Sequence, residues 1–129
     1  MLRRTHPPCV AGAARRAAAV GALLAAAACD APGEGPKAER GYRRAEPVIG
    51  ALGRFRTDRG AYPDSLPQLV PAYLPAAALA IPDRPQERYP LGYRRVAGHY
   101  ELTFRYAGPG MNECAYRSAT AAWACRGYF

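Results

Sequence analysis

The sequence predicts a small α+β domain in which one main N-terminal helix packs on a small antiparallel sheet of two hairpins. Three observations lead to this fold class. Apolar side chains recur with a helical period over residues 45–55. From residue 91 the period changes to two, which is typical of strands with one buried face. Two late cysteines, Cys114 and Cys125, stand at matching positions of the last two predicted strands.

The predicted helix has a single apolar stripe, which requires a partner surface to bury it. Its members are spaced i, i+3, i+4, i+7 and i+10: Ala45, Val48, Ile49, Leu52 and Phe55. Pro47 suits the first turn of a helix, where its missing N–H costs nothing. We therefore expect the helix to begin near Glu46. Gly60 suits a left-handed C-terminal cap, so the helix should end there.

A second, shorter helical turn is expected after Tyr62-Pro63, because the residue before a proline favours extended backbone. Ser65 and Gln68 have the spacing of a capping box. The apolar residues of one face follow: Leu66, Leu69, Val70 and Tyr73. Residues 76–90 should form a loop, since three prolines interrupt them.

The remaining chain predicts two hairpins. Residues 93–96 and 99–106 flank the turn Ala97-Gly98, and alternate residues of the second strand are apolar, from Tyr100 to Tyr106. Residues 113–117 and 122–126 form the second hairpin around residues 118–121. This register places Cys114 opposite Cys125 and Tyr116 opposite Trp123.

A disulfide is the expected state of Cys114 and Cys125 if the protein is exported. The alternative, a redox or metal-binding pair, favours Cys-x-x-Cys spacing or additional histidines, and the pair has neither. The chemistry-bearing residues elsewhere are few. His99 stands at a predicted turn, and Asp58 and Asp64 flank Tyr62. We expect no metal site, no cofactor and no catalytic set.

The N-terminus indicates export. Residues 1–28 contain two pairs of arginines, followed by an apolar run at 17–28. The run is shorter than the ~20 residues that span a bilayer. This pattern is typical of a signal peptide. Residues 24–29 resemble a bacterial lipobox, which implies that Cys29 is lipidated and begins the mature protein. The alternative is ordinary cleavage near Cys29. We expect residues 29–44 to form the lipidated cysteine with a flexible tether, and residues 45–129 the domain.

The predicted location is the periplasmic face of a bacterial envelope, with a lipid anchor. Asp30 resembles an inner-membrane retention signal and slightly favours that membrane.

The net charge is +8, but only 14 basic and 10 acidic residues follow residue 29. The arginines are scattered rather than clustered with aromatic residues, which argues against nucleic-acid binding.

A resemblance to a known family follows from the helix and the segment after it. The runs Asp58-Arg59-Gly60-Ala61-Tyr62-Pro63 and Ser65-Leu66-Pro67-Gln68-Leu69-Val70 resemble the globular head of type II secretion pseudopilins and type IV pilin-like proteins. That resemblance implies a half-helix on a small antiparallel sheet, with envelope or secretion proteins as partners. The N-terminal peptidase motif of that family has no match here.

Three functional interpretations follow. The leading one is a non-enzymatic envelope lipoprotein with a pseudopilin-like interaction or scaffold domain, accessory to secretion or envelope assembly. The second is a cell-wall or glycan-binding module, which would require exposed, coplanar Tyr and Trp rings. The third is an enzyme, which would require a deep cleft with His99 beside a carboxylate.

Overall fold

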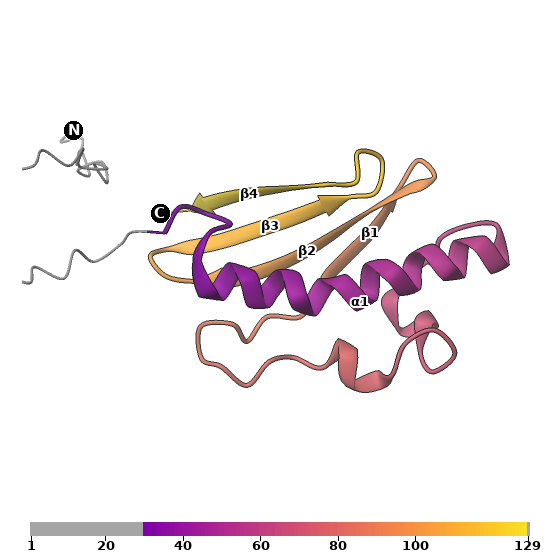
Figure 1. The fold of residues 1–129 in the computed structure, drawn as a ribbon, viewed down its shortest axis with the longest axis horizontal. Helices are drawn as coiled ribbons and strands as arrows, with labels where there is room; N and C mark the ends of the chain where they lie inside the picture. The colour runs from indigo at the N-terminus through magenta and orange to yellow at the C-terminus, as the bar shows by residue number, and fades with distance from the viewer. Residues whose placement is uncertain (1–29, 129) are drawn as a thin grey trace, which may run out of the picture.

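The computed structural model describes residues 30–128, and it confirms the predicted α+β fold. The helix and strands occur in the following order: α1 (Gly35–Arg59), β1 (Gly92–Val96), β2 (His99–Ala107), β3 (Met111–Arg117) and β4 (Ala122–Tyr128) (Figure 1). The strands form one antiparallel sheet in the order β1-β2-β3-β4. The predicted signal peptide and Cys29 lie outside the described residues. No helix within residues 30–128 is both long enough and apolar enough to cross a bilayer.

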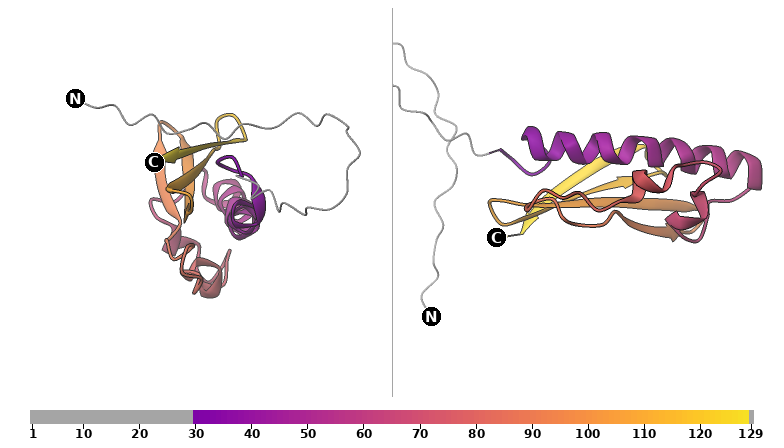
Figure 2. Two further views of the ribbon diagram at one scale, coloured as in Figure 1. Left: turned by 90° about the vertical axis from the view of Figure 1, so that its left-hand side faces the viewer. Right: turned by 90° about the horizontal axis from the view of Figure 1, so that it is seen from below.

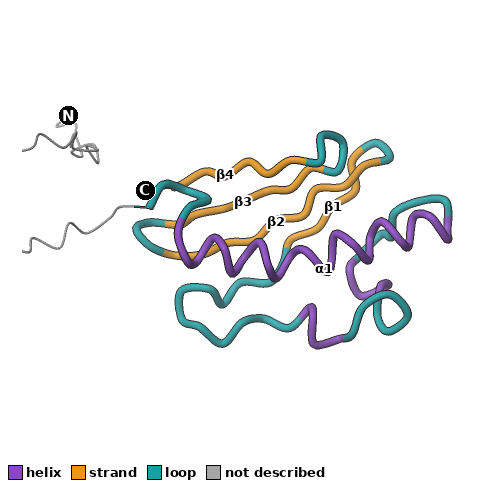
Figure 3. Tube along the Cα trace, viewed as in Figure 1, coloured by secondary structure: helices purple, strands orange, loops and turns teal. Residues whose placement is uncertain are grey.

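Helix α1 lies along one face of the sheet, and the opposite face is left uncovered by the described chain (Figure 2). The segment between α1 and β1 runs beside the helix as loop with two short 3₁₀ turns, η1 (Leu66–Leu69) and η2 (Ala76–Leu79) (Figure 3). The main core forms where helix, segment and sheet meet. The largest of its fully buried side chains are Leu52, Leu69, Leu102 and Val48.

The predicted apolar stripe of the helix is confirmed. Ala45, Val48 and Leu52 are fully buried, and Ile49 and Phe55 pack against the same core. The helix ends as expected, with Gly60 in the left-handed conformation at φ 81°. Its N–H donates to the carbonyl of Arg56 at 2.8 Å. Burial of the stripe therefore fixes which side of α1 meets the sheet.

The start of the helix was predicted wrongly. α1 begins at Gly35 rather than near Glu46, so the flexible tether expected over residues 29–44 is wrong from Gly35 onward. Pro36 occupies the first turn, and Pro47 lies inside the helix. An internal proline costs about 3 kcal/mol because it removes a hydrogen bond and crowds the preceding turn. Packing of the helix on both sides of Pro47 offsets this cost.

The first half of α1 was not predicted as helix because small residues make its contacts with the sheet. Ala38 is fully buried, and a Cβ at Gly41 would overlap the ring of Phe104. Tyr42 completes the contact, with its ring centroid 5.2 Å from that of Phe104 and 5.0 Å from that of Trp123. A close approach of backbone to sheet requires small side chains, and these give no apolar periodicity.

The capping box predicted at Ser65 does not form. Ser65 makes no side-chain cap, and the side-chain carbonyl of Gln68 instead accepts the backbone N–H of Asp64 at 2.8 Å. Two features of the 3₁₀ turn explain the difference. Pro67 has no N–H to offer Ser65, and the N–H of Gln68 donates to the backbone carbonyl of Ser65. Leu66 and Leu69 are buried, as the predicted face requires.

Both hairpins have the predicted register. Val96 pairs with His99 across Ala97 and Gly98, whose φ angles of 48° and 81° match a type I′ turn. In the second hairpin Cys114 pairs with Cys125 and Tyr116 with Trp123. Cys114 and Cys125 form a disulfide with their Cα atoms 4.1 Å apart. The bond ties the edge strand β4 to β3.

Candidate docking face

The uncovered side of the sheet has the clearest arrangement of charge in the described chain. Strand alternation that buries Tyr100, Leu102 and Phe104 under the helix turns Glu101, Thr103 and Arg105 to the other side. We call that side the outer face. Its central part consists of Gly92, Arg94, Glu101, Thr103, Arg105, Glu113, Ala115, Arg117, Ala124 and Arg126, and toward the strand ends the same side also carries Val96, His99, Ala107, Met111, Ala122 and Tyr128.

The register of the strands aligns the charges of the outer face into two rows. In one row Glu101 on β2 lies between Arg94 on β1 and Arg117 on β3. Its carboxylate oxygens are 3.3 Å from Arg94 Nη2 and 3.2 Å from Arg117 Nε. Arg117 donates a hydrogen bond to one oxygen of the carboxylate, and Arg94 forms an ion pair with the other.

The second row repeats the pattern one strand further along the sheet. Glu113 on β3 lies between Arg105 on β2 and Arg126 on β4. Arg105 Nε and Arg126 Nη2 are 2.7 Å and 2.8 Å from its two oxygens. Burial raises the pKa of Glu113. The hydrogen bonds from Arg105 and Arg126 lower it by more, so the net shift is downward. The carboxylate is therefore ionised at neutral pH and holds both guanidinium groups in place.

The rows present positive charge to the surroundings. The side chains of Glu101 and Glu113 are only 17% and 9% exposed, whereas those of the four arginines are 56% to 69% exposed. Between the rows lies a floor of short side chains: Gly92, Thr103, Ala115 and Ala124. The rows cross β2 at Glu101 and Arg105, four positions apart, which corresponds to about 13 Å. The outer face is thus a shallow floor with an arginine near each corner.

The candidate chemical residues from the sequence are not brought together. His99 is exposed at the start of β2. Asp58 accepts a hydrogen bond from Tyr73 Oη at 2.9 Å, and Asp64 forms an ion pair with Arg95 at 3.0 Å. The two aspartates therefore have separate partners. Within residues 30–128, no group of three or more His, Cys, Asp or Glu side chains is arranged to hold a metal ion.

The aromatic residues pack mainly edge to face rather than as a flat platform. Tyr100 is buried, and its ring lies at 80° to that of Tyr62. The half-buried pair Tyr116 and Trp123 is inclined at 58°. Burial raises the pKa of Tyr93 to about 12, and its hydroxyl donates to the carbonyl of Pro63 at 2.6 Å. The tyrosine excess thus contributes chiefly to the core and its rim.

The two charge rows were not predicted from the sequence, although a signal for them exists. The predicted alternation already placed Glu101 and Arg105 on the solvent side of their strand. The predicted pairing of Cys114 with Cys125 also places Glu113 opposite Arg126. The step that was missing is the pairing of β2 with β3, which sets Glu101 opposite Arg117 and Arg105 opposite Glu113.

Comparisons with protein-family models, with curated proteins and with solved structures found no match to this chain.

Proposed function

We propose that this protein is a non-enzymatic, lipid-anchored envelope module with a pseudopilin-like interaction or scaffold role in secretion or envelope assembly. Its partner is an envelope protein, and the outer face binds an acidic patch on that protein. The observation that carries this proposal is the uncovered sheet face with four projecting arginines and two low-lying glutamates.

The chemistry of the outer face supports an acidic protein partner. Guanidinium groups bind carboxylates through paired hydrogen bonds, and arginine is enriched at protein interfaces. The two glutamates orient the arginines before a partner arrives, which reduces the side-chain entropy lost on binding. The short side chains between the rows allow a partner to approach the sheet closely.

The position of the helix supports a membrane-proximal arrangement. Residues 30–34 alone separate the predicted lipid site at Cys29 from the start of α1 at Gly35. The anchor would therefore hold the domain close to the bilayer by the N-terminal end of the helix. A helix on an antiparallel sheet agrees with the pilin-like resemblance, and the disulfide agrees with a periplasmic location. Asp30 slightly favours the inner membrane.

Site-specific crosslinking in the native envelope tests the proposal. A photoreactive amino acid replaces Ala124, which is exposed on the outer face, and in a parallel strain it replaces the exposed Ala77 of η2. We expect a discrete protein adduct from position 124 and none from position 77. An adduct from position 77 alone would contradict the proposal.

Charge variants establish whether the adduct depends on the arginines. Arg94→Gln with Arg126→Gln removes one arginine from each row and should abolish the adduct. Arg43→Gln with Arg54→Gln removes the same charge from the exposed surface of α1 and should leave the adduct unchanged. Equal loss in both double variants would mean that overall charge, rather than the outer face, determines binding.

A further inference from the structure

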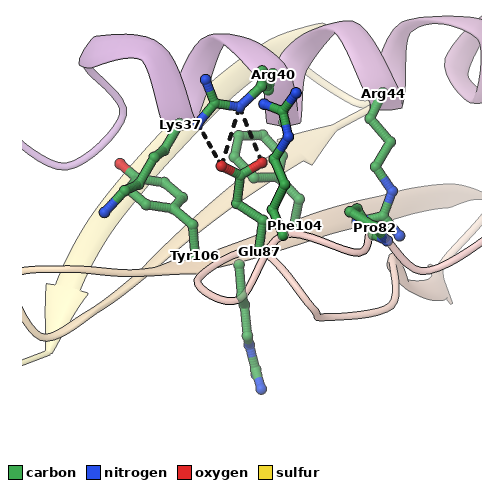
Figure 4. A pocket seen from close by; sticks show the side chains of 10 residues that line it. Lys37, Arg40, Arg44, Pro82, Glu87, Phe104 and Tyr106 are labelled. Atoms are coloured by element: carbon green, nitrogen blue, oxygen red, sulfur yellow. Dashed lines mark hydrogen bonds and ion pairs between the residues drawn. The ribbon is translucent and has the colours of Figure 1, made fainter.

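A second basic feature lies on the other side of the sheet, between the first half of α1 and the loop that precedes β1. It is a cleft of about 170 Å³ with Phe104 among the residues that line it (Figure 4). Lys37, Arg40 and Arg44 reach it from α1, at i, i+3 and i+7 of the helix. Arg84 and Glu87 reach it from the loop. Arg105 also lines the cleft, although its guanidinium group pairs with Glu113 on the outer face.

The cations of the cleft outnumber its anions. Arg40 and Glu87 neutralise each other, since Arg40 Nε is 3.1 Å from both carboxylate oxygens (Figure 4). The hydrogen bond from Arg40 lowers the pKa of Glu87, and the charges of Arg84 and Lys37 lower it further. Among the described residues, the one hydrogen-bond acceptor of Lys37 Nζ is the backbone carbonyl of Ala107, at 2.9 Å. Within residues 30–128, Lys37, Arg44 and Arg84 have no carboxylate partner.

Arg44 is the least satisfied of these cations. Its Nη1 donates to the carbonyl of Tyr89 at 2.8 Å. Its Nε and Nη2 are shielded from solvent and have no hydrogen-bond partner among the described residues. Burial lowers the pKa of Arg44. Buried polar groups in native proteins nearly always have a partner, and a buried charge has the strongest need of one. An anion in the cleft would supply it.

We propose that this cleft binds a phosphate group. The residues that line the cleft carry a net positive charge, which favours a phosphate monoester with a charge of about −2 or a diester with a single charge. Guanidinium groups present two N–H donors in the geometry that phosphate oxygens accept, and Arg44 has two such donors without partners. The volume of about 170 Å³ admits the phosphate with a small attached group.

The phosphate has two possible sources. One is a phospholipid headgroup, because the cleft lies along the first half of α1, next to the end at which the anchor is predicted. This source rests on the lipid anchor of the proposed function. The other is a soluble phosphate compound, which requires no anchor. The same cations serve both sources, so the experiment separates them.

Ligand-dependent thermal unfolding of the processed full-length protein in a neutral detergent tests the cleft. Sodium phosphate is titrated against sodium chloride of equal ionic strength, and we expect a saturable rise in Tm with phosphate. Arg44→Met should weaken the apparent affinity for phosphate at least tenfold. Arg43→Met removes the same charge from the adjacent, exposed position of α1 and should leave the affinity unchanged. No saturable rise, or equal weakening in both variants, would overturn the proposal.

A second titration identifies the source. Dihexanoyl phosphatidylglycerol, used below its micelle concentration, replaces inorganic phosphate in the same measurement. Tighter binding than that of phosphate, with the same dependence on Arg44, assigns the site to a lipid headgroup; weaker binding assigns it to a soluble phosphate.

Circular dichroism checks the fold of each variant, and Lys37→Gln replaces Arg44→Met if that variant does not fold. The phosphate titration and the Arg44 and Lys37 variants leave the four arginines of the outer face unchanged, so loss of the crosslink would leave this result standing.

Discussion

The two faces of the sheet are made by alternate residues of the same strands, yet they contribute differently to the protein. The covered face contains Leu102 and Phe104, which are 0% and 2% exposed, in contact with the helix core. The outer face contains ion pairs whose arginines are more than half exposed. Complete burial of a large apolar side chain stabilises the fold by about 1.5–3 kcal/mol, whereas an exposed ion pair contributes about 0–1 kcal/mol.

This difference separates stability from recognition. The covered face and the helix supply the larger share of the folding free energy, so substitutions on the outer face should cost less stability than those on the covered face. The contrast can be tested by paired substitutions, beginning with the one that should have the largest effect.

Phe104→Ala should destabilise the protein by about 3–5 kcal/mol, because it removes a buried ring and leaves a cavity beneath α1. Thr103→Ala, at the adjacent residue on the outer face, should cost less than about 1 kcal/mol. Urea unfolding at pH 7 measures both values. Comparable losses at the two positions would mean that the outer face is as important to stability as the covered one.

Removal of the disulfide should have the next largest effect. Cys114→Ala with Cys125→Ala should lower the free energy of unfolding by about 3 kcal/mol, as the chain-entropy model gives for a loop of this length. Because β4 is an edge strand, its backbone amides should lose protection from hydrogen exchange before those of β2 do. Uniform loss of protection across the sheet would show that the bond stabilises the whole fold rather than this edge.

Glu113→Gln should have the smallest of the three effects and a distinctive pH dependence. Its pKa is lowered in the folded state, so its stabilising contribution is present above the unfolded pKa of about 4.3 and is lost as the pH falls through the folded value. At pH 6 the variant should be about 1–2 kcal/mol less stable than the parent. Between pH 6 and pH 3 it should lose less stability than the parent does.

Urea unfolding at these two pH values checks the expectation, with Glu39→Gln on the exposed surface of α1 as the control. Glu87 also has a lowered pKa, so part of the acid sensitivity should remain in the Glu113 variant. An unchanged loss between pH 6 and pH 3 would show that the Arg105–Glu113–Arg126 row contributes no stability.

A second comparison, between the two halves of α1, shows where sequence reasoning succeeds. The half after Pro47 buries Val48 and Leu52, whose spacing is visible in the sequence. The half before Pro47 meets the sheet through Ala38 and Gly41, which carry little apolar signal. The cleft was not predicted for the same reason. Because residues 29–44 were interpreted as a tether, Lys37, Arg40 and Arg44 were not expected to lie on one side of a helix.

Local periodicity was enough to establish the α+β class, both hairpins, the pairing of Cys114 with Cys125 and the end of α1 at Gly60. These features depend on side-chain alternation, on turn residues and on backbone conformations that neighbouring residues determine. The start of the helix, the tolerance of Pro47 and the charge balance of the cleft depend on contacts between residues far apart in the chain. Packing on the Phe104 ring and closure by the loop at Glu87 decide them, and no local pattern records those contacts.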